Sequence, residues 1–240
     1  DRATVIAEST WQAIQARDAL SAEWDFSQAE NRGTEELRAE YTALLDEEGI
    51  AFHSAVVSQA DTEQVIEADY SFPYLAHTPM EPIDVTVRFD GTEATFWTGS
   101  QIQTLDQNIG AQVLGIDPGS VSIETLWGGG SFGRRAIYDS HYVAEAAMIA
   151  KAWLELVWTR EDDVRGGYYR PMHMHRVRAG LDADGNITSW EQRVVGQGIA
   201  IGTAFEQFMV RDGVDASSVE GLGEHSAYTI PGWSVDIHHP

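Results

Sequence analysis

The spacing of apolar residues changes along the chain and predicts where helices form. Residues that recur every three or four positions predict helices over 10–21, 37–48, 101–114 and 139–153. Ser9 and Gln12 have the spacing of a capping box at the start of the first helix, and Gly49 is the expected C-terminal cap of the second. In the third helix we expect the side chains of Leu105 and Ile109 to point inward.

Apolar residues that alternate with polar ones predict strands. These strands cover residues 64–72, 83–89, 94–97, 121–126, 154–158, 176–181 and 187–195. Asp90-Gly91 and Asp182–Asn186 are typical of turns between antiparallel strands, and residues 196–232 are expected to be rich in loops. Sheet segments interrupted by helices indicate an α+β fold with mixed or antiparallel sheets and flanking helices. We place a domain boundary near residue 50, which divides the chain into 1–50 and 51–240.

One junction does not fit this pattern. A helix that passes into a strand normally ends at Gly, Asn or Pro, and none of these lies between Met148 and Arg160. We therefore expect residues to be missing from the sequence near Trp153-Leu154.

The composition excludes several partners. Lys and Arg number 15 against 38 Asp and Glu, which gives a formal net charge of −23. Nucleic acid and anionic membrane surfaces need clustered cations, and the clusters here are few, namely Arg134-Arg135 and the group Arg170, Arg176 and Arg178. The chain has no cysteine and therefore no disulfide, thiolate nucleophile or cysteine-ligated cluster of its own. No apolar run approaches the roughly 18 residues of a spanning helix, so we expect no membrane insertion.

A glycine-rich segment is the clearest candidate for a binding site. Gly128, Gly130 and Gly133 satisfy the pattern G-x-G-x-x-G between a predicted strand and a predicted helix. This glycine loop would let the backbone approach a phosphate, and Arg134-Arg135 add positive charge where the phosphate would lie. Three interpretations stay open: a dinucleotide site with Glu155 as the nearest acid for a ribose, a plain tight turn, and a site for another anionic cofactor.

Two other groups of residues have a plain structural interpretation. His173 and His175 would lie on one side of a strand, as two metal ligands do, but the sequence offers no third ligand and we favour a polar strand face. The acidic runs Glu161-Asp162-Asp163 and Asp46-Glu47-Glu48 are interpreted as solvated charge.

Several segments share their order and spacing with one enzyme family. They are Ile66-Glu67-Ala68, Pro73–Pro82, Trp97–Gln101, Gly129–Ala136, Val157–Asp163 with Tyr169-Arg170-Pro171, and Tyr228–Pro231. Together they resemble the molybdenum cofactor subunit of the xanthine dehydrogenase and aldehyde oxidase family, in particular the beta subunit of isoquinoline 1-oxidoreductase. The resemblance implies that residues 51–240 form the first part of a molybdenum cofactor-binding domain, and that residues 1–50 are the tail of a preceding small domain.

The resemblance also implies which residues hold the cofactor. Gln101 would lie beside the metal and hydrogen-bond an oxo ligand, while the loop Gly130-Ser131-Phe132-Gly133 would approach the pterin. The cofactor would be a molybdenum pterin that carries either a simple phosphate or a dinucleotide pyrophosphate, such as the cytosine form. No residue of this chain is expected to ligate the metal.

Phe132 and Ala136 would border the substrate pocket. Ala136 stands where xanthine-oxidising members have a substrate-binding Glu, so the resemblance implies an aldehyde or an N-heteroaromatic substrate and argues against a purine. Tyr142 and Trp127 are interpreted as ordinary core residues.

The resemblance further implies components outside this chain. The family's general-base Glu has no match in residues 1–240, so we assign no catalytic residue and expect an internal fragment that is inactive alone. The implied partners are the remainder of its own subunit, a small subunit with iron–sulfur clusters, and a cytochrome or flavin subunit that takes the electrons onward. Localisation stays open between periplasm and cytoplasm, although many relatives of this branch are exported.

Two alternative functions remain beside the family resemblance. The first is a nucleotide-dependent oxidoreductase that uses the loop from Gly128 to Gly133. The second is an acidic binding module without catalytic activity, in which the same loop is only a turn.

Overall fold

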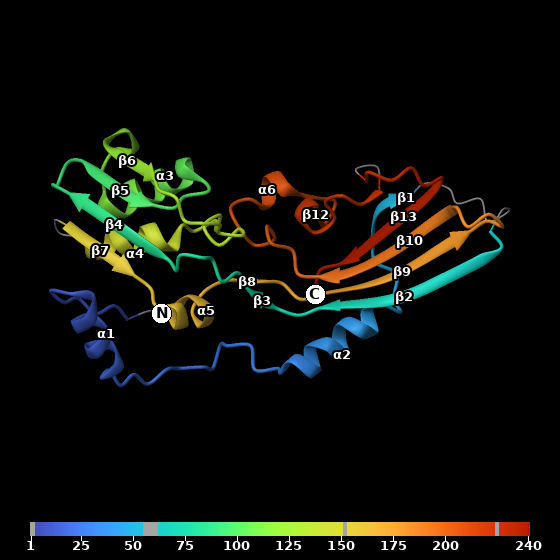
Figure 1. Cartoon of the computed structure of the whole chain (residues 1–240), viewed down its shortest axis with the longest axis horizontal. Coiled ribbons are helices and arrows are strands. Elements are labelled where there is room, and N and C mark those ends of the chain that lie inside the picture. Colours follow the sequence, from blue (N-terminus) through green and yellow to red (C-terminus); the bar gives the residue numbers. More distant parts are fainter. Residues whose placement is uncertain (1–2, 55–61, 151–152, 224–225) are drawn as a thin grey trace. The chain divides into compact units, whose positions relative to one another are not determined.

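The computed structural model describes residues 3–54, 62–150, 153–223 and 226–240, and Figure 1 labels its elements. The chain forms two compact units, Asp1–Gly33 and Thr34–Pro240. The first unit contains α1 (Thr10–Asp18). As predicted, Ser9 begins this helix, because its hydroxyl accepts a hydrogen bond from the amide of Gln12 at 3.3 Å.

A four-stranded mixed sheet carries the first core of the second unit. Its strand order is β6 (Val121–Thr125), β5 (Ala94–Thr98), β4 (Asp84–Phe89) and β7 (Trp153–Val157). β4 pairs antiparallel with β5 and β7, whereas β5 and β6 are parallel. Two helices, α3 (Gln103–Leu114) and α4 (His141–Ile149), pack on this sheet and on each other (Figure 1). The buried side chains between these layers include those of Ile83, Val85, Val87, Phe96, Ala111, Tyr142, Val143 and Ala146.

A five-stranded sheet carries the second core. Its strand order is β1 (Ile50–Ser54), β13 (Gly232–His238), β10 (Ile187–Gly196), β9 (His173–Leu181) and β2 (Gln64–Phe72). β9 and β10 form the antiparallel hairpin that the turn at residues 182–186 predicts, whereas β10 and β13 are parallel. The helix α2 (Thr34–Leu44) packs on this sheet, where Tyr41 and Leu45 contact Met174 and Val195.

Short elements complete the second unit. They are β3 (Leu75–Ala76) paired with β8 (Tyr169–Arg170), α5 (Arg160–Arg165), the 3-10 turns Pro118–Ser120 and Ala216–Ser218, α6 (Glu206–Met209), and β11 (Val210–Arg211) paired with β12 (Val214–Asp215). Most of residues 196–232 form loops, as predicted. None of the helices in the described part of the chain is long and apolar enough to cross a membrane.

The predicted α+β class with mixed sheets and flanking helices is confirmed, but two details of the helices are wrong. Gly49 does not cap the second helix, which ends at Leu44; a Cβ at Gly49 would lie 2.8 Å from the carbonyl oxygen of Ile237, so glycine permits close approach to β13. In α3, Leu105 and Ile109 are only half-buried. The buried side of α3 carries Asp106, Gly110 and Ala111 instead, and the carboxylate of Asp106 is hydrogen-bonded there.

Two expectations on boundaries stay predictions. The helix α4 ends at Ile149 and β7 begins at Trp153, and Lys151 and Ala152 lie outside the described residues, so the expectation of missing residues near Trp153-Leu154 is not tested. The division near residue 50 likewise remains a prediction about domain organisation.

Candidate functional site

The glycine loop follows β6 and has a backbone that favours glycine. The angle φ is 72° at Gly129 and 111° at Gly130. Phe132 also has a positive φ, 53°, which is uncommon for a residue with a side chain and marks local strain. The loop rests on Met80, whose amide donates to the carbonyl of Gly130 at 3.3 Å. A Cβ at Gly129 would lie 3.2 Å from the Cβ of Met80, so the two segments are in close contact.

The amide groups and the carbonyl groups of the loop differ in their hydrogen bonding. In the described part of the chain, none of the amides of residues 129–133 donates a hydrogen bond to another residue. The loop carbonyls are used, because Ser131 accepts from the amide of Arg134 at 2.9 Å and Gly133 accepts from the amide of Ala136 at 3.0 Å. Successive amides without internal partners form a surface that binds anions through backbone donors.

Gln101 adds a side-chain donor that is tied to the end of the loop. It is exposed, and its Oε1 accepts the backbone amide of Arg135 at 3.1 Å. Because an amide side chain has one accepting and one donating end, this bond leaves the NH₂ group of Gln101 for a ligand.

The guanidinium of Arg135 points away from the loop into the protein. It is buried, and it donates to Oγ1 of Thr98 at 2.9 Å, to Oδ1 of Asp84 at 2.9 Å and to the carbonyl of Pro82 at 3.1 Å. These hydrogen bonds connect Pro82 and the first residue of β4 to Thr98 at the end of β5.

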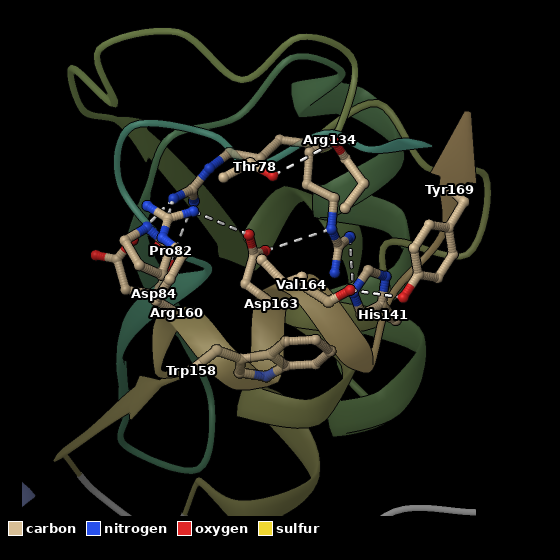
Figure 2. A network of polar contacts seen from close by, with 12 residues as sticks. Thr78, Pro82, Asp84, Arg134, His141, Trp158, Arg160, Asp163, Val164 and Tyr169 are labelled. Carbon is tan, nitrogen blue, oxygen red and sulfur yellow. Dashed lines mark hydrogen bonds and ion pairs between the residues drawn. The ribbon is translucent and has the colours of Figure 1, made fainter. Parts of the chain in front are cut away.

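Arg134 is buried in a second polar network, shown in Figure 2. Its Nε lies 3.5 Å from Oδ1 of Asp163, its Nη1 lies 3.1 Å from Nε2 of His141, and its guanidinium stacks over the ring of Trp158 at 5.4 Å. Arg160 pairs with the same carboxylate at 3.3 Å (Figure 2). The expectation that the two arginines place positive charge at the loop is thus wrong, because both guanidinium groups are buried and pair with carboxylates, Arg134 with the buried Asp163 and Arg135 with the partly exposed Asp84.

The network around Arg134 also orients the ring of His141. Arginine only donates, so Nε2 of His141 accepts and the ring proton lies on Nδ1, which faces Oδ1 of Asp139 at 3.4 Å. Burial alone would raise the pKa of Asp139, but hydrogen bonds from His141 and Tyr168 lower it to about 2. His141 therefore links the guanidinium of Arg134 to the carboxylate of Asp139.

The acidic run at 161–163 is not simply solvated charge. Asp163 is buried between Arg134 and Arg160. Asp162 closes a capping box with Thr159 at the start of α5, and only Glu161 is exposed. The sequence interpretation fails here because net charge does not reveal which carboxylate meets a buried cation. The other run behaves as expected at Asp46, which is largely exposed and pairs with Arg176 at 2.6 Å.

The two histidines of β9 form a polar strand face, as we favoured. The rings of His173 and His175 stack with centroids 5.8 Å apart, and Nδ1 of His175 lies 2.8 Å from Nε2 of Gln192. Burial, and then the neighbouring His173, lower the pKa of His175 to about 4. The described residues contain no group of three or more metal-binding side chains.

The residues expected near the substrate differ in exposure. Phe132, within the loop, is 69% exposed, and Ala136, three residues after the loop, is half-buried. Tyr142 is a core residue, as predicted, but Trp127 is fully exposed immediately before the loop, so its assignment to the core is wrong. A tryptophan in an apolar-rich sequence gives no signal that distinguishes a core position from an exposed one.

Two titratable residues that border the loop, His77 and Glu81, are not among the site residues predicted from the sequence. The imidazole of His77 lies 3.8 Å from where a Cβ on Gly133 would be, and its Nδ1 is buried without a partner among the described residues. Oε2 of Glu81 lies 3.4 Å from the equivalent position on Gly128. Burial lowers the pKa of His77, and burial followed by the charge of Asp84 raises that of Glu81. Both residues lie in the segment 73–82, which is one of the segments that carry the family resemblance. This segment is the sequence signal by which they could be identified.

The topology separates this loop from a dinucleotide site. In such a site the helix opens directly from the glycine loop, whereas α4 begins only at His141 and the intervening residues include the two buried arginines. Glu155 lies on β7, which pairs antiparallel with β4. The fold therefore belongs to a class other than the doubly wound nucleotide-binding folds.

The comparison with known families gives this class a name. The sequence model of the molybdopterin cofactor-binding domain matches residues 47–237. The chain belongs to this family.

Curated relatives of several activities match the chain at similar identity. The membrane-bound aldehyde dehydrogenase [pyrroloquinoline-quinone] of Gluconacetobacter polyoxogenes is 28% identical over 88% of this chain and 28% of its own length. The isoquinoline 1-oxidoreductase subunit beta of Brevundimonas diminuta is 29% identical over 68% of this chain and 21% of its length. The aldehyde oxidoreductase molybdenum-binding subunit PaoC of Escherichia coli K12 is 28% identical over 78% of this chain and 26% of its length. The chain therefore spans about a quarter of these relatives, and its likeness is not specific to the isoquinoline branch.

Solved structures confirm the fold. Quinoline 2-oxidoreductase of Pseudomonas putida 86 superposes with a TM-score of 0.62 at 16% identity, over 96% of this chain and 30% of that one. The aldehyde oxidoreductase of Desulfovibrio gigas has a TM-score of 0.56 at 17% identity, over 79% of this chain and 21% of that one.

Proposed function

We propose that this chain is part of the large subunit of a molybdenum hydroxylase, which oxidises an aldehyde or an N-heteroaromatic compound with water as the oxygen source. The observation that carries the proposal is the row of amides at residues 129–133 that have no partner among the described residues, near the side-chain donor of Gln101. These donors fit an anionic pterin cofactor, because a phosphate and an oxo group both accept hydrogen bonds. The membership in the molybdopterin family supports the same conclusion.

In this proposal, the loop Gly130-Ser131-Phe132-Gly133 holds the cofactor through its backbone, and Gln101 donates to it from the side. The bound molybdenum centre would supply the redox chemistry that the protein side chains lack. The chain's own contribution is to bind and orient the cofactor, since its cationic side chains nearest the loop are occupied in the interior. The dinucleotide form of the pterin, such as the cytosine form, is part of the proposal to be tested.

The substrate class follows from the side of the loop that Phe132 and Ala136 border. Phe132 offers an exposed aromatic face, and Ala136 offers no polar partner for a purine ring. The curated relatives whose names contain an aldehyde or isoquinoline support these two classes. The general base, the iron–sulfur subunit and a cytochrome or flavin subunit would lie outside this chain, which would be inactive alone.

The experiment is a measurement of molybdenum and released pterin in the complete subunit that contains this chain, purified with its small partner from a host that matures other molybdenum enzymes. The proposal predicts near-stoichiometric molybdenum and pterin in the wild type and a marked loss in Gln101→Ala. Absence of both from the wild type would contradict the proposal and favour the acidic binding module. Saturable binding of NAD instead would favour the nucleotide-dependent alternative.

A further inference from the structure

The side-chain oxygen of Gln101 accepts a hydrogen bond, and contacts from each end of this bond lead to one buried carboxyl group, that of Asp106. Ser100, the residue before Gln101, donates to Oδ2 of Asp106 at 2.5 Å. The hydroxyl of Tyr142 lies 2.7 Å from the same Oδ2 and 3.2 Å from the carbonyl oxygen of Arg135. The amide of Arg135 in turn donates to Oε1 of Gln101. Asp106, on α3, and Tyr142, on α4, therefore close a ring of contacts around the Gln101 side chain.

This ring lies in the interior, although the side chain that it orients is exposed. Asp106 is 1% exposed and Tyr142 is fully buried. Burial raises the pKa of Asp106, and the hydroxyls of Ser100, Ser140 and Tyr142 and the charge of Arg135 act in the opposite direction. A buried carboxylate is costly for a protein and needs several donors, so its position beneath an exposed donor calls for an explanation beyond packing.

We propose that Tyr142 and Asp106 are positioning residues for Gln101, which hold its carboxamide so that the NH₂ end faces the cofactor bound by the glycine loop. The inference rests on the proposed function for the identity of that ligand. Without the tyrosine hydroxyl, the carboxyl group of Asp106 loses a donor and the carbonyl of Arg135 loses its contact with α4, so the backbone that donates to Gln101 is held less firmly. The carboxamide of Gln101 can then rotate, so that its oxygen faces the anionic group of the cofactor in place of the NH₂ group. Two acceptors that face each other repel.

The test is a double-mutant cycle on the rate at which the complete holo-subunit loses its molybdenum and pterin after gel filtration. Tyr142→Phe keeps the ring in the core and removes only the hydroxyl, and we expect cofactor loss to become about tenfold faster, the effect of one hydrogen bond. In the Gln101→Ala background, the same change is expected to alter the rate by less than about twofold, because the side chain that it positions is gone. Ser100→Ala removes the other arm and provides a second variant if Tyr142→Phe folds poorly.

The matched control is Tyr41→Phe, which removes a buried tyrosine hydroxyl in the core beneath the five-stranded sheet. It should leave the rate of cofactor loss unchanged. An equal acceleration by Tyr142→Phe in the wild-type and Gln101→Ala backgrounds would overturn the inference and assign Tyr142 a role in fold stability only. No acceleration in either background would overturn it as well.

A second readout separates the inference from the proposed function. Hydrogen exchange of the Arg135 amide, measured without cofactor, reports directly on its bond to Gln101. We expect Gln101→Ala and Tyr142→Phe each to speed exchange of this amide, whereas Tyr41→Phe does not. If the wild-type subunit holds no molybdenum but this pattern is observed, the proposed function fails and the positioning contacts stand. Unchanged exchange in Tyr142→Phe would contradict the positioning role whatever the cofactor content.

Discussion

The glycine loop and the two arginines that follow it are adjacent in sequence but have opposite environments. The amides of residues 129–133 find no partner among the described residues, and Phe132 is exposed. Arg134 and Arg135 are each 1% exposed and are surrounded by acceptors. The loop amides are therefore available to a ligand. The side chains of the two arginines instead bind other parts of the protein and hold the C-terminal end of the loop in place.

The comparison shows how an acidic chain can bind an anion without cationic side chains at the site. Backbone amides carry partial positive charge, need no counterion in the empty protein and are held in place by the chain itself. A buried ion pair is costly to break because it leaves an uncompensated charge. Rigid anchoring by Arg134 and Arg135 and recognition by the loop are thus separate tasks, which mutations can test separately.

The largest effect is expected from removing an anchor. Arg134→Leu leaves Asp163 with a single cation and deprives His141 of its donor, so we expect the free energy of unfolding to fall by about 3 to 5 kcal/mol. Urea denaturation of the complete subunit measures this loss. Arg165→Leu is the control, because Arg165 is exposed at the end of α5, the helix that carries Asp163. This change should alter the free energy of unfolding by less than about 0.5 kcal/mol. Equal small losses in both variants would show that Arg134 is not an anchor.

The next effect is a dependence on pH. Burial, together with the charges of Arg134 and Arg170, lowers the pKa of His77 below its ordinary value, although the carbonyl of Tyr168 acts in the opposite direction. The unfolded chain then binds more protons below about pH 6.5, so stability rises with pH and is lost on acidification. We expect His77→Asn to flatten the decline in the free energy of unfolding between pH 7.5 and 5, measured by urea denaturation.

His175 serves as the remote comparison for His77. Its pKa of about 4, against an ordinary value of about 6.5, corresponds to a contribution of up to about 3 kcal/mol that is lost as the pH falls through this window. His175→Asn should flatten the decline without changing cofactor retention, whereas His77→Asn should change both, because His77 lies against Gly133. Unchanged cofactor retention in both variants would show that His77 does not help the loop to hold the cofactor.

A smaller effect is expected from backbone strain in the loop. Gly130 and Gly91 have similar positive φ angles, 111° and 98°. Changing either to Ala should destabilise the folded protein by about 1 to 2 kcal/mol, since alanine disfavours this region. Thermal denaturation of the two variants checks this equality. A much larger loss in Gly130→Ala would show that the loop, like the arginines, stabilises the fold.

The smallest effect on stability is expected at Phe132. Its side chain is exposed and its φ is positive, so Phe132→Gly relieves strain and removes little buried surface. We expect the free energy of unfolding to change by less than about 1 kcal/mol, while KM for the substrate rises in the complete enzyme. A strong loss of stability with unchanged KM would place this side chain in the fold and outside the pocket.

The sequence predicted the elements well where periodicity and turn residues agree. The hairpin around residues 182–186, the turn at Asp90-Gly91 and the cap at Ser9 occur as predicted. The position of the glycine loop between β6 and α4 also follows from the sequence. These features are local, and so a single stretch of chain contains the information that specifies them.

The sequence did not reveal which charged residues are buried. Nothing in the pattern of Arg134, Arg135 and Asp163 shows that Asp163, distant in sequence, meets Arg134 inside the fold. The burial of Asp106 is likewise not apparent from the sequence, because the predicted inward residues of its helix are apolar. Burial of a charge is decided by long-range partners, which spacing within a segment cannot report.

The central claim is that the unpartnered amides of residues 129–133 in the described structure hold the molybdenum cofactor. The most direct measurement is the ratio of molybdenum and pterin to protein in Gly130→Ala and Gly91→Ala, prepared in parallel in the complete subunit. We expect equal stability of the two variants, wild-type cofactor content in Gly91→Ala, and at least about a tenfold lower content in Gly130→Ala. Wild-type cofactor content in Gly130→Ala would contradict it.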